Sequence, residues 1–346
     1  MKKIDFEVHF ATRGWVEALE KNPGYPRLAR DPASGNRRLY YQADAGEPLP
    51  DALLEKLLDI DAGRIAAMDA AGVDMAILSL TSPGVEQLEP TAATKLAREA
   101  NDELARAVAK HPGRLLGYAA LSPKDTETAA KEMERAVQDL GLKGWKTHSN
   151  YGDSYLDEKR YWPLLAKAEE LDAPIYLHPT VPKIKEFWSY GLDLAGPSFG
   201  FGAETSLTMM RLVFSGAFDA FPNLKVVIGH YGEGLPFLLD RMDFASNFPH
   251  VAADTGAFVP LERRPSDYLK ENMWISTSCN YLPAAFLCCQ DALGMDRIVF
   301  GSDYPYGKME ECLAFLAGRS LSADDERKLY ESNAAHLGVT APGSTR

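Results

Sequence analysis

Five side chains that suit acid–base or metal chemistry accompany short apolar runs in this sequence. Glu7 and His9 lie within IDFEVHF, His178 ends PIYLH, His230 ends LKVVIGH, and Asp303 follows RIVFGS. Imidazoles and carboxylates without a thiolate are typical ligands of a divalent transition metal. A metal ion would also compensate carboxylates that are otherwise costly to bury.

The spacing of these residues favours a joint site. Glu7 and His9 are two residues apart in a run that predicts a strand, so both side chains should point to one face. Asp5 shares that face by the same rule, and we expect it one layer deeper, where it would orient a ligand. A single histidine at a strand end is more often structural than catalytic. Here several strand ends carry such residues, which predicts a metal site and leaves the choice of ligands open.

Eight short apolar runs alternate with helical patterns along the chain. The predicted strands are 4–9, 75–80, 115–121, 142–148, 174–178, 224–230, 273–278 and 297–301. The predicted helices are 51–71, 90–110, 125–140, 157–171, 204–218, 233–244 and 283–293. This α/β alternation is typical of parallel units that close into a (β/α)8 TIM barrel. An open doubly wound sheet is the alternative, but the first turns lack the G-x-G-x-x-G of its nucleotide-binding form.

We predict a single domain over residues 1–346, with long loop insertions at about 10–50 and 179–203. Both insertions follow predicted strands. They should therefore lie over the C-terminal mouth of the barrel, where active sites of this fold are built. Their Pro, Gly, Tyr and Trp content predicts an ordered lid.

Bulk composition limits the partners and the compartment. The formal net charge of −12 argues against nucleic acid or an anionic membrane as a partner. No apolar run reaches the ~18 residues of a membrane span, and the N-terminus lacks a signal-peptide pattern. The four cysteines (279, 288, 289 and 312) form no C-x-x-C pair, which favours thiols in a reducing compartment over a structural zinc site. We expect a cytoplasmic location.

Four further polar residues are candidates for the site. Lys146 and His148 lie on the fourth predicted strand, where a carboxylated lysine could bridge two metals; we favour a single metal. Arg64 lies on the helix that leads into the second strand, and Arg241 lies on the helix after the sixth. Either guanidinium could bind a carboxylate in a forked geometry. The alternative for both arginines is an ordinary position on a helix surface.

An ordered set of motifs links the chain to a known group. FEVHFATR, LTSPG, LHP, FGFGAET, GHYGEGLPFLLDR and GSDYPY extend over most of the sequence. Together they resemble the amidohydrolase-2 branch of the metal-dependent amidohydrolase superfamily. More narrowly, they are similar to its non-oxidative hydroxybenzoate decarboxylases, which act on γ-resorcylate, 2,3-dihydroxybenzoate or 5-carboxyvanillate. Hydrolases of the superfamily usually begin with His-x-His, whereas Glu7 gives Glu-x-His, as in the dihydroxybenzoate decarboxylases.

The resemblance implies a role for each candidate. The metal ligands would be Glu7, His9, His178 and Asp303. His230 and Glu233 would form a catalytic pair that supplies Asp303, the proposed proton donor. Arg64 would contact substrate, and Arg241 would reach the active site of a neighbouring subunit, which implies a homodimer or homotetramer. Carboxyvanillate enzymes have no imidazole at the position of His9, so ligation by His9 and the identity of the substrate stay open.

The expected activity is metal-dependent, non-oxidative decarboxylation of a hydroxylated aromatic carboxylic acid, the reaction of a carbon–carbon lyase. It would use one divalent metal ion, with Mn²⁺ and Zn²⁺ ahead of Mg²⁺. A metal-dependent hydrolase of the lactonase type is the alternative, since it uses the same ligands. A barrel that only binds ligand would be expected to have lost one of Glu7, His178, His230 or Asp303, and the sequence retains all four.

Overall fold

The computed structural model describes residues 1–43, 45–246 and 259–339. Eight parallel strands follow one another around a barrel in chain order. They are β1 (Ile4–Phe10), β5 (Met75–Leu80), β6 (Leu115–Ala119), β7 (Gly144–His148), β8 (Ile175–His178), β9 (Val226–Ile228), β10 (Met273–Ser276) and β11 (Ile298–Val299). The last strand meets the first, because Phe6 N donates to Phe300 O at 2.9 Å and Val8 bridges Tyr304. The (β/α)8 barrel is confirmed, and all eight predicted strands are present.

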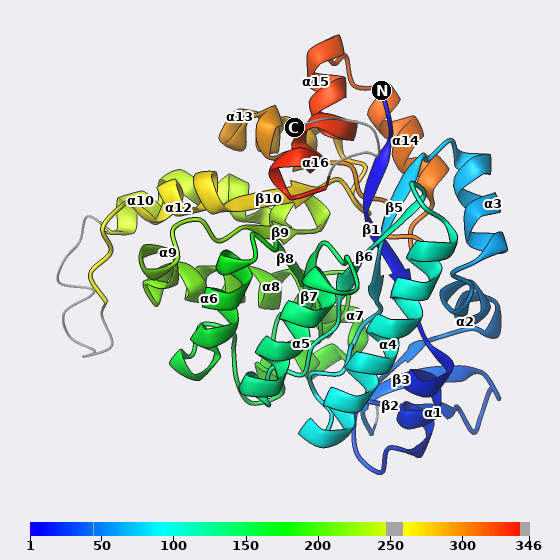
Figure 1. Ribbon diagram of the computed structural model, residues 1–346. Coiled ribbons are helices and arrows are strands. Elements are labelled where there is room, and N and C mark those ends of the chain that lie inside the picture. The colour runs from blue at the N-terminus through cyan, green and yellow to red at the C-terminus, as the bar shows by residue number, and fades with distance from the viewer. Residues whose placement is uncertain (44, 247–258, 340–346) are drawn as a thin grey trace.

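Helices pack around the outside of the barrel (Figure 1). The principal ones are α4 (Pro90–Lys110), α5 (Thr126–Gln138), α6 (Trp162–Glu170), α8 (Gly200–Phe214), α12 (Pro265–Asn272), α13 (Pro283–Leu293) and α14 (Met309–Ala317). Shorter elements are η1 (Lys159–Tyr161), η2 (Lys185–Tyr190), α7 (Leu192–Ala195), η4 (Met295–Arg297), α15 (Ala323–Arg327), η5 (Lys328–Ser332) and α16 (Asn333–His336). No helix in the described ranges combines the length and apolarity that crossing a membrane requires.

Three predicted helices are interrupted in the structure. The 51–71 helix is two, α2 (Asp51–Leu58) and α3 (Ala62–Ala71), because the Asp59 carboxylate accepts from Asp61 N and competes with the helical pattern. The predicted 204–218 helix is also divided into two. Helix α8 ends at Phe214, and Gly216 at φ +75° separates it from α9 (Ala217–Ala220). The 233–244 helix is replaced by η3 (His230–Leu238) followed by α10 (Leu239–Ser246).

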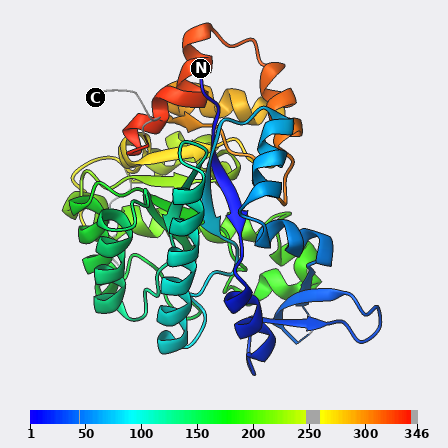
Figure 2. The same ribbon diagram turned by 45° about the vertical axis from the view of Figure 1, so that its right-hand side comes forward.

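The insertion at 10–50 carries its own secondary structure. It contains α1 (Arg13–Lys21) and a three-stranded antiparallel sheet of β2 (Arg27–Arg30), β3 (Arg37–Gln42) and β4 (Ala45–Pro48). Leu28 and Leu39 of this sheet are buried in the main core, so the insertion is anchored to the barrel. Figure 2 shows it at the end of the barrel toward which β1 runs. Strand β4 contacts α7 of the second insertion, so both insertions meet over this mouth.

Strand β1 contains a register shift that the period-two pattern did not predict. Its pairing with β5 shifts between Asp5 and Val8. Ile4 and Phe6 consequently pack inside the barrel, whereas Val8 packs with the core outside it. The expectation that Asp5 shares the face of Glu7 and His9 is therefore wrong. Asp5 instead accepts hydrogen bonds from Ser302 N, at 3.0 Å, and from Ser302 Oγ.

Candidate active site

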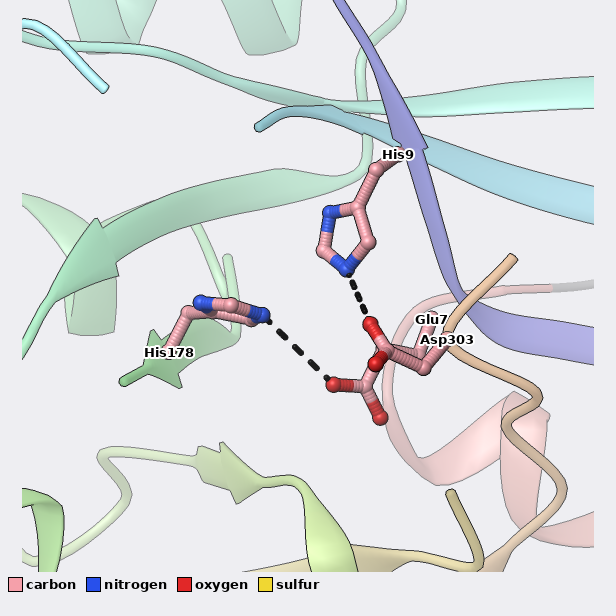
Figure 3. Close-up of side chains that lie close together, drawn as sticks. All are labelled: Glu7, His9, His178 and Asp303. Atoms are coloured by element: carbon pink, nitrogen blue, oxygen red, sulfur yellow. Dashed lines mark hydrogen bonds and ion pairs between the residues drawn. The ribbon is translucent and has the colours of Figure 1, made fainter. Parts of the chain in front are cut away.

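Four of the predicted residues meet at the C-terminal mouth of the barrel. Glu7 and His9 come from β1, His178 from the end of β8 and Asp303 from the loop after β11 (Figure 3). One ligand atom of each lies within 4.8 Å of those of the other three. His9 Nε2 is 2.7 Å from Asp303 Oδ1, and His178 Nε2 is 3.7 Å from Glu7 Oε1. The sequence-predicted ligand set thus forms one buried cluster.

The unpaired atoms of this cluster fit a cation. Among the described residues, Glu7 Oε1 and His178 Nε2 are buried and have no hydrogen-bond partner. Burial lowers the pKa of His178 well below its ordinary value, so the ring is neutral and offers a lone pair. Its Nδ1 lies 3.0 Å from Pro179 O, to which it can donate while Nε2 faces the cluster. A buried carboxylate oxygen beside a free imidazole nitrogen is the arrangement that a divalent metal satisfies.

Neighbouring groups fix the orientation of Glu7. Ser276 Oγ, from β10, donates to Glu7 Oε2 at 2.5 Å. Gly229 lies just before the turn that carries His230 and Glu233, and a Cβ on it would stand 2.8 Å from Glu7 Oε1. The absence of a side chain at Gly229 therefore leaves room for the carboxylate and for an ion beside it.

Lys146 contacts His9, the ligand whose role the sequence leaves open. Lys146 Nζ lies 3.2 Å from His9 Nδ1 and donates to Leu80 O at 2.8 Å. Burial lowers the pKa of Lys146 to about 7. An ammonium can only donate, which would leave the His9 proton on Nε2; the neutral amine can accept from Nδ1–H and free Nε2 for a metal. Ligation by His9 is thus chemically tied to the neutral form of Lys146.

A second pair lies beside the cluster. His230 Nδ1 is 2.6 Å from Glu233 Oε1, and His230 Nε2 is 4.0 Å from Asp303 Oδ2. Burial works to lower the pKa of His230, yet the carboxylates of Glu233 and Glu7 outweigh it and hold this pKa well above its ordinary value. Burial works to raise the pKa of Asp303, but His230 and His9 hold it below its ordinary range. With these side chains alone, the proton therefore rests on His230 and Asp303 is ionised.

The backbone is strained around these residues. Among the described non-glycine residues, six have positive φ, and five of them lie at this mouth: His230, Tyr231, Glu233, Cys279 and Asp303, at 50–62°. Such conformations cost free energy and concentrate at functional sites. The turn from Tyr231 to Gly234 is left-handed throughout, which aims Glu233 back at the His230 ring.

Neither predicted substrate arginine lines the cavity of its own chain. Arg64 is buried, and its Nη2 donates to His9 O at 2.9 Å and to Lys56 O at 2.8 Å. Its guanidinium also lies over the Tyr304 ring, 5.0 Å from the centroid. Arg241 is exposed on α10. Substrate contact by either side chain stays a prediction, and Arg64 has a structural role in holding β1 against α2.

The cluster opens into a cavity of about 570 Å³. Its walls include residues of the second insertion, such as Phe201 and Gly202, and three residues that sequence reasoning missed: Glu47, Cys279 and Tyr306. Glu47 comes from β4 of the first insertion, which is far along the chain from the nearest barrel strands, β1 and β5. Cys279 Sγ lies 3.2 Å from Asp303 Oδ2. Of these three residues, only Tyr306 could have been predicted from the sequence, because it follows Asp303 closely in GSDYPY.

A parallel (β/α)8 barrel with candidate imidazole and carboxylate ligands at its C-terminal mouth is typical of a metal-dependent barrel enzyme. The family model described as amidohydrolase matches residues 4–337, and the chain belongs to this family.

Individual relatives of this chain are decarboxylases. The chain is 36% identical over 329 residues to the γ-resorcylate decarboxylase of Rhizobium sp. strain MTP-10005, an alignment that covers 92% of this chain and 97% of that protein. The 5-carboxyvanillate decarboxylase of Sphingomonas paucimobilis has a similar structure, with a TM-score of 0.86, 33% identity, and 97% and 98% coverage. The dihydroxybenzoic acid decarboxylase of Polaromonas sp. JS666, with bound manganese and 2-nitroresorcinol, has a TM-score of 0.82, 34% identity, and 97% and 96% coverage.

Proposed function

We propose that this protein is a metal-dependent, non-oxidative decarboxylase of hydroxylated aromatic carboxylic acids, a carbon–carbon lyase. One observation carries the proposal: the cluster of Glu7, His9, His178 and Asp303 adjoins the proton-holding pair of His230 and Glu233 in one cavity. The decarboxylase relatives support it over most of the chain.

The four clustered residues would hold one divalent metal ion. When bound, the ion would supply positive charge that stabilises the anionic oxygens of the substrate and keeps phenolate charge available to the ring. Mn²⁺ is our first choice because the Polaromonas relative was crystallised with it; Zn²⁺ and Mg²⁺ suit the same donor types.

The protein side chains supply the proton. Asp303 is the proposed donor to the ring carbon that bears the carboxylate, after it takes a proton from His230 Nε2, 4.0 Å away. A C–H bond forms at that carbon and the ring loses its aromaticity. The C–C bond to the carboxylate then breaks, its electron pair restores the ring, and CO2 leaves. Glu233 holds the imidazolium of His230 in place, and solvent returns the proton.

The substrate arginines remain part of the proposal. Arg64 fixes the backbone of His9 directly, so its loss should disturb the ligand cluster even without substrate contact. Arg241 would act in a neighbouring subunit of a homodimer or homotetramer. Exposed apolar side chains beside it support an interface on this face: Phe237 is 79% exposed and Leu238 is 41% exposed. The absence of disulfides among the described cysteines is compatible with the cytoplasmic location we propose.

The test combines metal analysis with a CO2-release screen over dihydroxybenzoates, 2-hydroxybenzoate and 5-carboxyvanillate. We expect about one metal ion per chain and CO2 release from at least one of these acids. Asp303→Asn should abolish turnover while ligand binding remains measurable. A lactonase-type hydrolase would release no CO2 from any of them, and full activity of Asp303→Asn would refute the assigned proton donor.

A further inference from the structure

One wall of the cavity comes from outside the barrel. Glu47 lies on β4, the last strand of the small sheet in the first insertion, and it pairs with Leu39 of β3. Leu39 is buried in the main core, so the backbone that carries Glu47 is anchored. Glu47 therefore presents a carboxylate to the cavity from a fixed position.

Only one of the two carboxylate oxygens of Glu47 accepts a hydrogen bond from the described part of the protein. Tyr41 OH donates to Glu47 Oε2 at 3.2 Å. Within the described part of the chain, Oε1 has no hydrogen-bond partner, although Glu47 lines the cavity. The free oxygen is an acceptor available to a ligand.

The cavity is poor in positive charge. Its described lining includes the carboxylates of Glu47, Glu233 and Asp303 and contains no lysine or arginine. The protonated ring of His230 also lines it, and that ring is paired with Glu233. A substrate with a second carboxylate near Glu47 would meet a like charge, and the described lining offers no lysine or arginine to offset it.

We infer that Glu47 is a specificity-determining residue that accepts a hydrogen bond from a second ring hydroxyl of the substrate. The inference rests on the proposed decarboxylase function and deepens it. The substrate class is an aromatic monocarboxylate with one hydroxyl beside the carboxylate and another directed at Glu47. Acids with a second carboxylate in that place, as in 5-carboxyvanillate, are disfavoured. Two variants separate the contributions of the hydrogen bond and the charge. Glu47→Gln keeps a hydrogen-bond acceptor and removes the charge, whereas Glu47→Leu removes both.

The test measures kcat/KM of the manganese-loaded wild type, Glu47→Gln and Glu47→Leu at pH 8. Burial raises the pKa of Glu47 to about 7, so the carboxylate form dominates at this pH. Substrates are the dihydroxybenzoates, 2-hydroxybenzoate and 5-carboxyvanillate. We expect the wild type to prefer one dihydroxybenzoate over 2-hydroxybenzoate by at least about tenfold. Glu47→Leu should lower kcat/KM for that acid about 10- to 100-fold and for 2-hydroxybenzoate less than about threefold. For the preferred acid, the kcat/KM of Glu47→Gln should lie between the values of the wild type and Glu47→Leu.

Tyr41→Phe is the matched control, because it removes the hydroxyl that holds Glu47 and keeps the carboxylate. It should retain most of the preference. Equal losses for both substrates in Glu47→Leu, or a wild type that prefers 5-carboxyvanillate, would overturn the inference.

A direct binding measurement separates failure of the inference from failure of the proposed function. If no acid releases CO2, the decarboxylase proposal fails, and calorimetry of resorcinol, catechol and phenol with the manganese-loaded protein still tests Glu47. At least one diphenol should bind the wild type about tenfold more tightly than phenol, and Glu47→Leu should remove the difference. Equal affinities in the wild type, or no measurable binding, would overturn the role of Glu47.

Discussion

Asp5 should make the folded protein less stable as pH rises. Its side chain is fully buried and accepts hydrogen bonds from Ser302 N and Oγ and from Glu7 N. Burial outweighs these bonds and raises the pKa of Asp5 from 3.8 to about 7. The perturbation is Asp5→Asn, which keeps the size of the side chain and removes its ionisation.

The magnitude follows from this pKa. The folded state binds the proton more tightly than the unfolded chain, so the stabilising proton is present below pH 3.8 and is lost as pH rises through about 7. Since one pKa unit corresponds to about 1.36 kcal/mol, the total effect is about 4 kcal/mol. Between pH 5 and pH 8, the free energy of unfolding of the wild type should fall by about 2–3 kcal/mol more than that of Asp5→Asn.

The assay is urea unfolding of chelator-treated protein at several values between pH 5 and pH 8, which excludes a contribution from metal binding. Asp291→Asn, on the exposed side of α13, controls for the loss of one negative charge. The difference between wild type and Asp5→Asn should change steadily with pH, whatever its offset. A difference that stays constant within about 0.5 kcal/mol would refute a buried, proton-binding Asp5.

Three shorter predictions concern the site. Gly229→Ala places a Cβ 2.8 Å from Glu7 Oε1, so Mn²⁺ affinity measured by titration should fall about 10- to 100-fold; unchanged affinity would argue against Glu7 as a ligand. Gly202→Ala places a Cβ 2.6 Å from Glu233 Oε2 inside α8, where alanine favours the helix, so kcat should fall while the unfolding free energy does not. Mn²⁺ at about 100 times its Kd should stabilise the chelator-treated protein by about 2.7 kcal/mol, as denaturation with and without the ion would reveal.

The sequence predicted the parts of the protein that depend on regular periodicity. Apolar runs of strand length and the helices between them gave all eight barrel strands and most of the outer helices. The candidate ligands lie at strand ends, and a parallel barrel brings those ends to one mouth. Glu7, His9, His178 and Asp303 could therefore be grouped from the order of residue types along the chain alone.

Interruptions of the pattern could not be predicted in this way. The register shift in β1 turns Asp5 away from Glu7, and no residue between them signals it. Glu47 reaches the cavity only because β2, β3 and β4 pair as a small sheet over the mouth, which depends on tertiary contacts with the core. The sequence around Glu47 does not predict that its side chain shares a cavity with Asp303.

The strained turns lie at predictable strand ends, but their backbone conformation depends on tertiary contacts. His230, Glu233, Cys279 and Asp303 adopt a backbone conformation that non-glycine residues avoid, which local propensity alone would not select. Contacts from distant segments hold two of these turns: Ser278 Oγ accepts from His230 N at 3.0 Å, and Tyr304 O, beside Asp303, accepts from His9 N at 2.7 Å. The barrel therefore supplies the free energy that keeps the proposed proton-transfer residues in place. Chemistry at this mouth should fail before the fold does when such contacts are weakened.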